Sequence, residues 1–190
     1  MKVLGISGSL RRDSHNTNLL RAAAKLVDSA TELELWDGLK AVPPYDADDD
    51  VAEAPAAVAE LREAIAGADA VLFATPEYNA SIPGQLKNAL DWVSRPLATN
   101  PLRNKPVAVV GASTGAFGAV WSQAELRKVL AAIGARVLEC EVACRYAAAS
   151  FDEHGRLVDD EARMQLAEAV EQLVEAARAR DGARAASIAA

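Results

Sequence analysis

The sequence predicts a single α/β domain built on a doubly wound parallel sheet with helices on both faces. Short apolar runs alternate along the chain with longer segments of helical periodicity. No repeat, linker or change of composition divides the 190 residues, a length that suits one domain with its own core. The pattern of alternating strands and helices favours a parallel sheet.

The amino-terminal half predicts three strands, each followed by a helix. Residues 3–6 form an apolar run typical of a buried strand, and Leu19 and Ala23 begin an apolar helix face that extends to Ala30. Leu33 and Leu35 alternate with glutamates, which indicates a strand near a sheet edge. After a loop with two prolines and the acidic run 46–50, the remaining elements are a helix over 58–65, a strand over 70–74 and a helix over 86–93.

The carboxyl-terminal half predicts two strands and two helices. Residues 107–110 are continuously apolar, as a central parallel strand requires. The spacing Ser122 to Glu125 is that of a capping box, so a helix is expected to start near Ser122. A strand over 136–142 and a helix over 166–177 complete a domain of residues 1–180, with a frayed tail over 181–190. Right-handed crossovers favour the strand order 2-1-3-4-5, which is the flavodoxin-like topology.

Composition limits the partners. The net charge of −7 argues against nucleic acid or an acidic membrane. No apolar run is long enough to span a bilayer and Met1 leads almost directly into a strand, so we expect a cytoplasmic protein without a leader. The two cysteines, Cys140 and Cys144, lack the spacing of a zinc site, and we expect no metal.

Ligands of such sheets bind at the carboxyl ends of the strands, where the strand order reverses. The loop after the first strand opens a helix, and a helix start offers unpaired N–H groups to an anion. Arg11 can neutralise charge, and the loop is neither a Walker A nor a G-x-G-x-x-G motif. Its hydroxyl and amide donors are Ser9, Ser14, Asn16 and Thr17. Capping of the helix by Ser14 or Asn16 is the alternative, but one cap explains one residue.

The loops after the third and fourth strands are also distinctive. Residues 75–84 contain two prolines, Tyr78, Asn79 and a glycine. The prolines stiffen the backbone, so its N–H and carbonyl groups can contact the edge of a planar heterocycle at fixed positions. The simpler alternatives to a ligand-binding role are that Tyr78 packs as an ordinary side chain and that Glu77 is a solvated charge in the loop. Residues 111–119 are rich in glycine, which lets a backbone approach a ring closely.

With these loops the chain resembles the NAD(P)H-dependent FMN reductase family, which includes quinone, chromate and azo-dye reductases. The resemblance rests on Gly8-Ser9-Leu10-Arg11, on residues 76–92 and on the turn 151–157, and it covers residues 2 to about 180. It implies bound FMN. The implied cofactor-binding residues are Ser9, Arg11, Ser14, His15, Asn16 and Thr17 near the phosphate, Pro76, Glu77, Tyr78 and Asn79 beside the ring, and Ser113, Thr114 and Gly115 at its pyrimidine side. His15, Ala119 and Trp121 depart from the usual family residues.

The resemblance also implies an activity. NADPH or NADH would pass hydride to FMN, and the flavin would then give two electrons to a quinone, azo compound, metal oxyanion or free flavin, with no catalytic side chain required. Arg11 or Arg12 could meet the 2′-phosphate of NADPH, but the sequence does not separate the two donors. A homodimer or homotetramer is expected. The alternatives are a flavodoxin-type electron carrier and a flavin-free interaction protein on the same scaffold.

Overall fold

The computed structural model describes residues 1–50 and 54–189. A parallel sheet lies at its centre, in the order β2-β1-β3-β4-β5, with β6 also paired to β4. The predicted order 2-1-3-4-5 is therefore confirmed. The strands are β1 Lys2–Ser7, β2 Glu32–Trp36, β3 Ala70–Thr75, β4 Pro106–Ala112, β5 Arg136–Val137 and β6 Ala143–Cys144.

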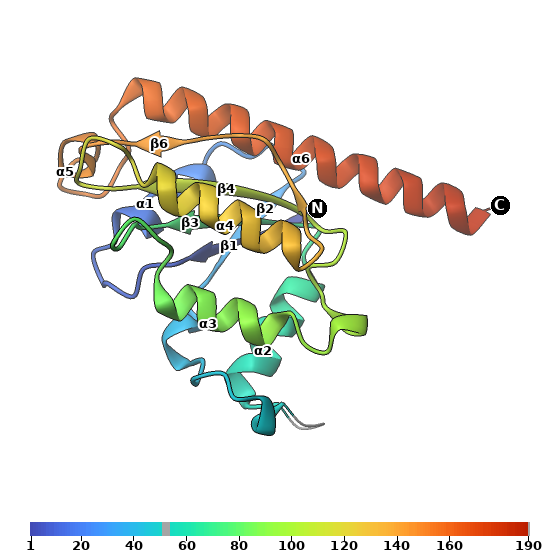
Figure 1. Ribbon diagram of the computed structural model, residues 1–190. Coiled ribbons are helices and arrows are strands. Elements are labelled where there is room, and N and C mark those ends of the chain that lie inside the picture. The colour runs from blue at the N-terminus through green and yellow to red at the C-terminus, as the bar shows by residue number, and fades with distance from the viewer. Residues whose placement is uncertain (51–53, 190) are drawn as a thin grey trace.

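Helices cover both faces of the sheet, as predicted (Figure 1). One apolar core lies between the sheet and α1 and α6, and the other lies between the sheet and α2, α3 and α4. Strands β3 and β4 are buried along their whole length, as their continuous apolar sequences require. The helices are α1 His15–Ala23, α2 Ala56–Ala66, α3 Gly84–Val93, α4 Val120–Ala132, α5 Ala147–Ser150 and α6 Asp160–Ala189, with short 3₁₀ turns η1 Gly38–Ala41, η2 Ala47–Asp49 and η3 Leu97–Thr99.

The fifth strand differs from the prediction of one strand over 136–142. Only Arg136–Val137 and, past the predicted end, Ala143–Cys144 pair with β4. Between them, the carbonyl oxygens of Cys140 and Val142 accept hydrogen bonds from the side chains of Arg127 and Gln123 on α4. The interruption therefore coincides with the place where helix side chains bind the backbone.

Three helix ends also differ from expectation. α1 ends at Ala23, whereas the predicted apolar helix face extends to Ala30. α4 begins at Val120, two residues before Ser122, and the hydroxyl of Ser122 does not cap it. α6 continues to Ala189, through the segment where the sequence predicted a frayed tail (Figure 1). Whether that segment frays in solution stays a prediction. In the described residues, no helix is both long enough and apolar enough to cross a membrane.

Candidate cofactor site

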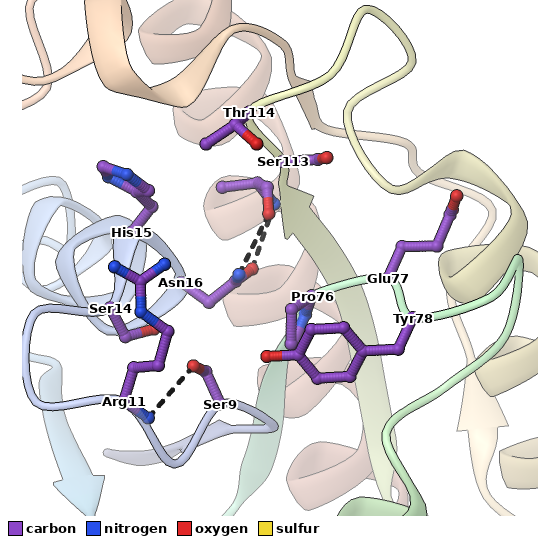
Figure 2. Close-up of a pocket in the computed structure, with 11 residues that line it drawn as sticks. Ser9, Arg11, Ser14, His15, Asn16, Pro76, Glu77, Tyr78, Ser113 and Thr114 are labelled. Atoms are coloured by element: carbon purple, nitrogen blue, oxygen red, sulfur yellow. Dashed lines mark hydrogen bonds between the residues drawn. The ribbon is translucent and has the colours of Figure 1, made fainter.

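Three loops meet at the carboxyl ends of β1, β3 and β4, and a pocket lies between them (Figure 2). The three strands are neighbours in the sheet, so their following loops are brought together by the register of the strands. Most of the residues predicted from the sequence line this pocket. The lining residues are Ser9, Arg11, Ser14, His15, Asn16, Pro76, Glu77, Tyr78, Ala112, Ser113 and Thr114.

The first loop presents the start of α1 to the pocket. Ser14 is the N-cap residue, and its Oγ accepts a hydrogen bond from the N–H of Thr17 at 3.3 Å. The capping alternative is thus confirmed for Ser14. The N–H groups of His15 and Asn16 have no hydrogen-bond partner among the described residues. Two free donors at the positive end of a helix form a site for an anion.

Asn16 connects the first loop to the third. Its Nδ2 donates to the carbonyl oxygen of Ala112 and its Oδ1 accepts from the N–H of Ala112, both at 3.0 Å (Figure 2). The residue is only 3% exposed. Because both ends of the amide are used, Asn16 holds the start of α1 against the end of β4, and its backbone N–H is the group left for a ligand.

Arg11 and the start of α1 make the pocket electropositive, and His15 lies beside Arg11. The Arg11 side chain extends from the loop toward His15 (Figure 2) and forms no hydrogen bond or ion pair within the described residues. Burial, followed by the charge of Arg11, holds the pKa of His15 below its usual 6.5. The His15 ring stacks on Phe151 with centroids 5.6 Å apart, and its buried Nδ1 has no partner in the described chain.

The charged residue of the second loop holds this loop to α4. The Oε2 of Glu77 accepts hydrogen bonds from the N–H groups of Trp121 and Ser122, at 3.1 and 3.2 Å, so Glu77 caps α4. Tyr78 pairs with Ser81 through two backbone bonds of 3.1 Å. Asn79 lies at the tip of this turn, outside the pocket lining, with a φ of 53°.

The third loop is held from behind by the segment that follows β6. The N–H groups of Tyr146 and Ala147 donate to the carbonyl oxygens of Gly115 and Ser113. The Oγ of Ser113 accepts from the N–H of Gly115 at 3.2 Å. Ser113 and Thr114 therefore border the pocket on a fixed turn, while Gly115 lies just outside its lining.

One predicted residue of the first loop lies away from the pocket, and two residues of the site were not predicted. The hydroxyl of Thr17 donates to Ser7 Oγ at 3.1 Å, below the loop, and Thr17 does not line the pocket. Ala112 lines the pocket but looks like an ordinary strand residue in the sequence, and only the hydrogen bonds between β4 and Asn16 of α1 reveal it. Phe151 begins the turn 151–157 of the family resemblance, but its stacking on His15 was not predicted.

The donor set fits a phosphate monoester. Two free helix N–H groups and the Arg11 guanidinium lie at one small cavity of about 100 Å³. This volume is below the roughly 300–1,000 Å³ of typical small-ligand sites, so the pocket can enclose only one end of a larger ligand. The described residues contain no cluster of side chains that could hold a metal ion.

Comparison with known proteins gives a consistent result. The family model described as NADPH-dependent FMN reductase matches residues 1–149. An NAD(P)H-dependent FMN reductase of Pseudomonas aeruginosa is 47% identical over 164 residues, which cover 86% of this chain and 88% of that protein. A quinone reductase of Escherichia coli K12 is 40% identical over 139 residues, 73% of each chain.

Solved structures agree with the fold. FerB, a flavoenzyme NAD(P)H:(acceptor) oxidoreductase from Paracoccus denitrificans, superposes with a TM-score of 0.84 at 35% identity, covering 93% of this chain and 97% of its own. A flavodoxin of Pseudomonas aeruginosa, 19% identical with a TM-score of 0.57, covers 91% of this chain and 99% of its own and shares the fold alone. The chain belongs to the NADPH-dependent FMN reductase family.

Proposed function

We propose that this protein is an NAD(P)H-dependent FMN reductase that delivers electrons to quinones, with azo compounds, metal oxyanions and free flavin as further acceptors. The observation that carries the proposal is the electropositive pocket at the start of α1, opposite two ordered loops. Family membership and the similarity to FMN and quinone reductases support it.

The phosphate of FMN would bind at the start of α1. The N–H groups of His15 and Asn16 and the hydroxyl of Ser9 would donate to its oxygens, and Arg11 would balance its charge. Ser14 and the side chain of Asn16 would act indirectly, since the structure uses them to cap α1 and to bind Ala112. The residues at this end thus bind and orient the cofactor.

The remainder of the cofactor would lie over the second and third loops. Pro76, Tyr78 and the turn from Ser113 to Gly115 would border the ring through backbone groups, with Asn79 at the turn tip. Glu77 would keep the second loop fixed by holding it to α4. FMN itself would supply the two-electron carrier between nicotinamide and acceptor.

Exposed aromatic side chains near the site support a homodimer or homotetramer. Tyr78, Phe117 and Trp121 are 49%, 60% and 48% exposed, and the rings of Phe117 and Trp121 lie 4.8 Å apart. Clustered apolar side chains on a surface are typical of protein interfaces. Light scattering gives the mass in solution, and we expect a multiple of the 20.0 kDa chain. We place the protein in the cytoplasm.

The acidic segment 46–50 gives little support to the electron-carrier alternative. Asp50 pairs with Arg62 at 3.2 Å, and the Asp46 carboxylate caps η2 through the N–H of Asp48. Two of its carboxylates are therefore used within the fold rather than offered to a protein partner.

The test combines a spectrum, a turnover assay and one variant. The purified protein should take up FMN, and NADPH or NADH should bleach it anaerobically and support steady quinone reduction. Arg11→Ala should weaken FMN binding by about 1.5–3 kcal/mol, the scale of a charged hydrogen bond. Arg136→Ala is the control, because this exposed residue begins β5 at the opposite end of the sheet. A protein that binds no FMN, or that needs a partner protein for turnover, would refute the proposal.

A further inference from the structure

A second cavity lies on the other side of the first loop. It has a volume of about 580 Å³ and is formed by the end of β1, the outer side of α1, the end of β2 and η1. Ser9 and Arg11 line both cavities, so the two are separated only by this stretch of the loop. Its volume is within the range of small-ligand sites, and of the residues proposed to contact FMN only Ser9 and Arg11 line it.

The second cavity collects positive charge on an acidic chain. Arg11, Arg12, Arg21 and Lys40 line it, against the single carboxylate of Asp37, while the whole chain carries −7. Within the described residues, no ion pair or side-chain hydrogen bond involves Arg12 or Lys40, and Arg21 bonds only to the neutral Asn18. A cavity whose cations are not neutralised locally attracts an anion of more than one charge.

The same cavity offers a flat apolar surface. Trp36 is half-buried in its wall, beside the apolar side chains of Leu35 and Leu39. The indole lies directly against Gly38, since a Cβ on Gly38 would come within 2.5 Å of Trp36 Cζ2. Such an aromatic surface can stack on a nucleobase. The wall and the cations together suit a phosphorylated nucleoside rather than a simple anion.

We infer that this cavity binds the adenosine 2′-phosphate end of NADPH, an inference that rests on the proposed function. The nicotinamide end must reach the ring over the second and third loops, and the loop shared by the two cavities lies between that place and Trp36. Asp37 alone would suit the free 2′-hydroxyl of NADH. With Arg11 assigned to the FMN phosphate, Asp37 still faces three cations, Arg12, Arg21 and Lys40, so the cavity favours the phosphorylated ribose.

The test measures binding directly on the FMN-loaded protein. Calorimetry should show that adenosine 2′,5′-bisphosphate binds at least tenfold more tightly than 5′-AMP. The double variant Arg12→Ala/Lys40→Ala should reduce that ratio about tenfold or more, the loss expected for charge-assisted contacts. The same variant should raise the KM for NADPH by a similar factor and change the KM for NADH less than twofold. Arg136→Ala, which removes one positive charge at the opposite end of the sheet, should change none of these.

The inference and the proposed function fail in different ways. Equal binding of the bisphosphate and 5′-AMP, or a ratio unchanged by the double variant, overturns the adenosine site even if the enzyme oxidises NADPH. Displacement of the bisphosphate by an equal concentration of inorganic phosphate overturns recognition of the nucleoside. A protein that oxidises neither nicotinamide refutes the proposed function. Both substituted residues are exposed, so an unchanged melting temperature identifies a folded variant.

Discussion

Replacing Asn16 by alanine tests how the first and third loops are held together. The amide of Asn16 makes two hydrogen bonds of 3.0 Å to the backbone of Ala112, 96 residues away, and both groups are buried. Alanine removes both bonds and leaves the N–H and the carbonyl of Ala112 without these partners. We therefore expect a loss of stability and a looser cofactor pocket.

The magnitude follows from the two bonds. A typical intramolecular hydrogen bond contributes about 1 kcal/mol net, and a buried group left without a partner costs about 1–3 kcal/mol. The better helix propensity of alanine offsets about 0.5 kcal/mol of this. The expected decrease in the free energy of unfolding is about 2–4 kcal/mol, a substantial part of the roughly 5–15 kcal/mol of an ordinary domain.

Urea unfolding of the FMN-free protein measures the decrease, and Asn18→Ala is the matched control. Asn18 lies two residues further along α1, where, among the described residues, its Oδ1 accepts a bond only from Arg21. The control should lose less than about 1 kcal/mol, as expected for a partly exposed bond. If Asn16→Ala lost no more than Asn18→Ala, the two bonds to Ala112 would not be holding the loops, and the argument would be wrong.

Three further predictions concern the same end of the sheet. Glu77→Gln keeps an oxygen that can accept from the α4 N–H groups, so it should lower the stability measured by thermal melts by only about 0.3–1 kcal/mol. Glu77→Ala should lower the stability more, and equal losses in the two variants would contradict capping. Gly118→Ala should lower the melting temperature by about 4–8 °C, because φ is +59° and the new Cβ would lie 2.6 Å from the Ala143 carbonyl carbon. Gly84→Ala is the control and should leave the melting temperature unchanged, because the space around Gly84 is open. The pKa of His15 is lower in the folded than in the unfolded chain, so the unfolded chain binds more protons as the pH falls below 6.5. The free energy of unfolding of the FMN-free protein should therefore decrease below pH 6.5, and it should decrease less in His15→Gln.

The fold was predictable because its signals are local. The apolar runs of β3 and β4 and the helical periodicity of α2 and α3 each lie within about ten residues, and handedness rules then leave few topologies. The positions of the three loops follow from the same rules. This explains why most of the predicted pocket residues do line one cavity.

The features that escaped prediction depend on contacts between distant segments. The capping-box spacing at Ser122 is a local signal, but the α4 N–H groups are bound by Glu77, 44 and 45 residues earlier. The interruption of the fifth strand coincides with hydrogen bonds from Arg127 and Gln123, whose role as backbone donors is not visible in their sequence. Apolar periodicity says nothing about which polar side chain reaches a backbone group across the fold.

Asn16 and Glu77 show that a residue of a family motif can hold the fold in place rather than contact the ligand. Both lie in the loops that the family resemblance assigns to the cofactor, and both direct their side chains to a backbone in another part of the chain. Loops that are fixed before a ligand arrives lose less conformational entropy on binding, so such residues raise affinity without touching the ligand. Asn16→Asp should therefore weaken FMN binding together with stability, because its carboxylate faces the Ala112 carbonyl. A variant with reduced affinity but unchanged stability would instead place the Asn16 side chain on the ligand.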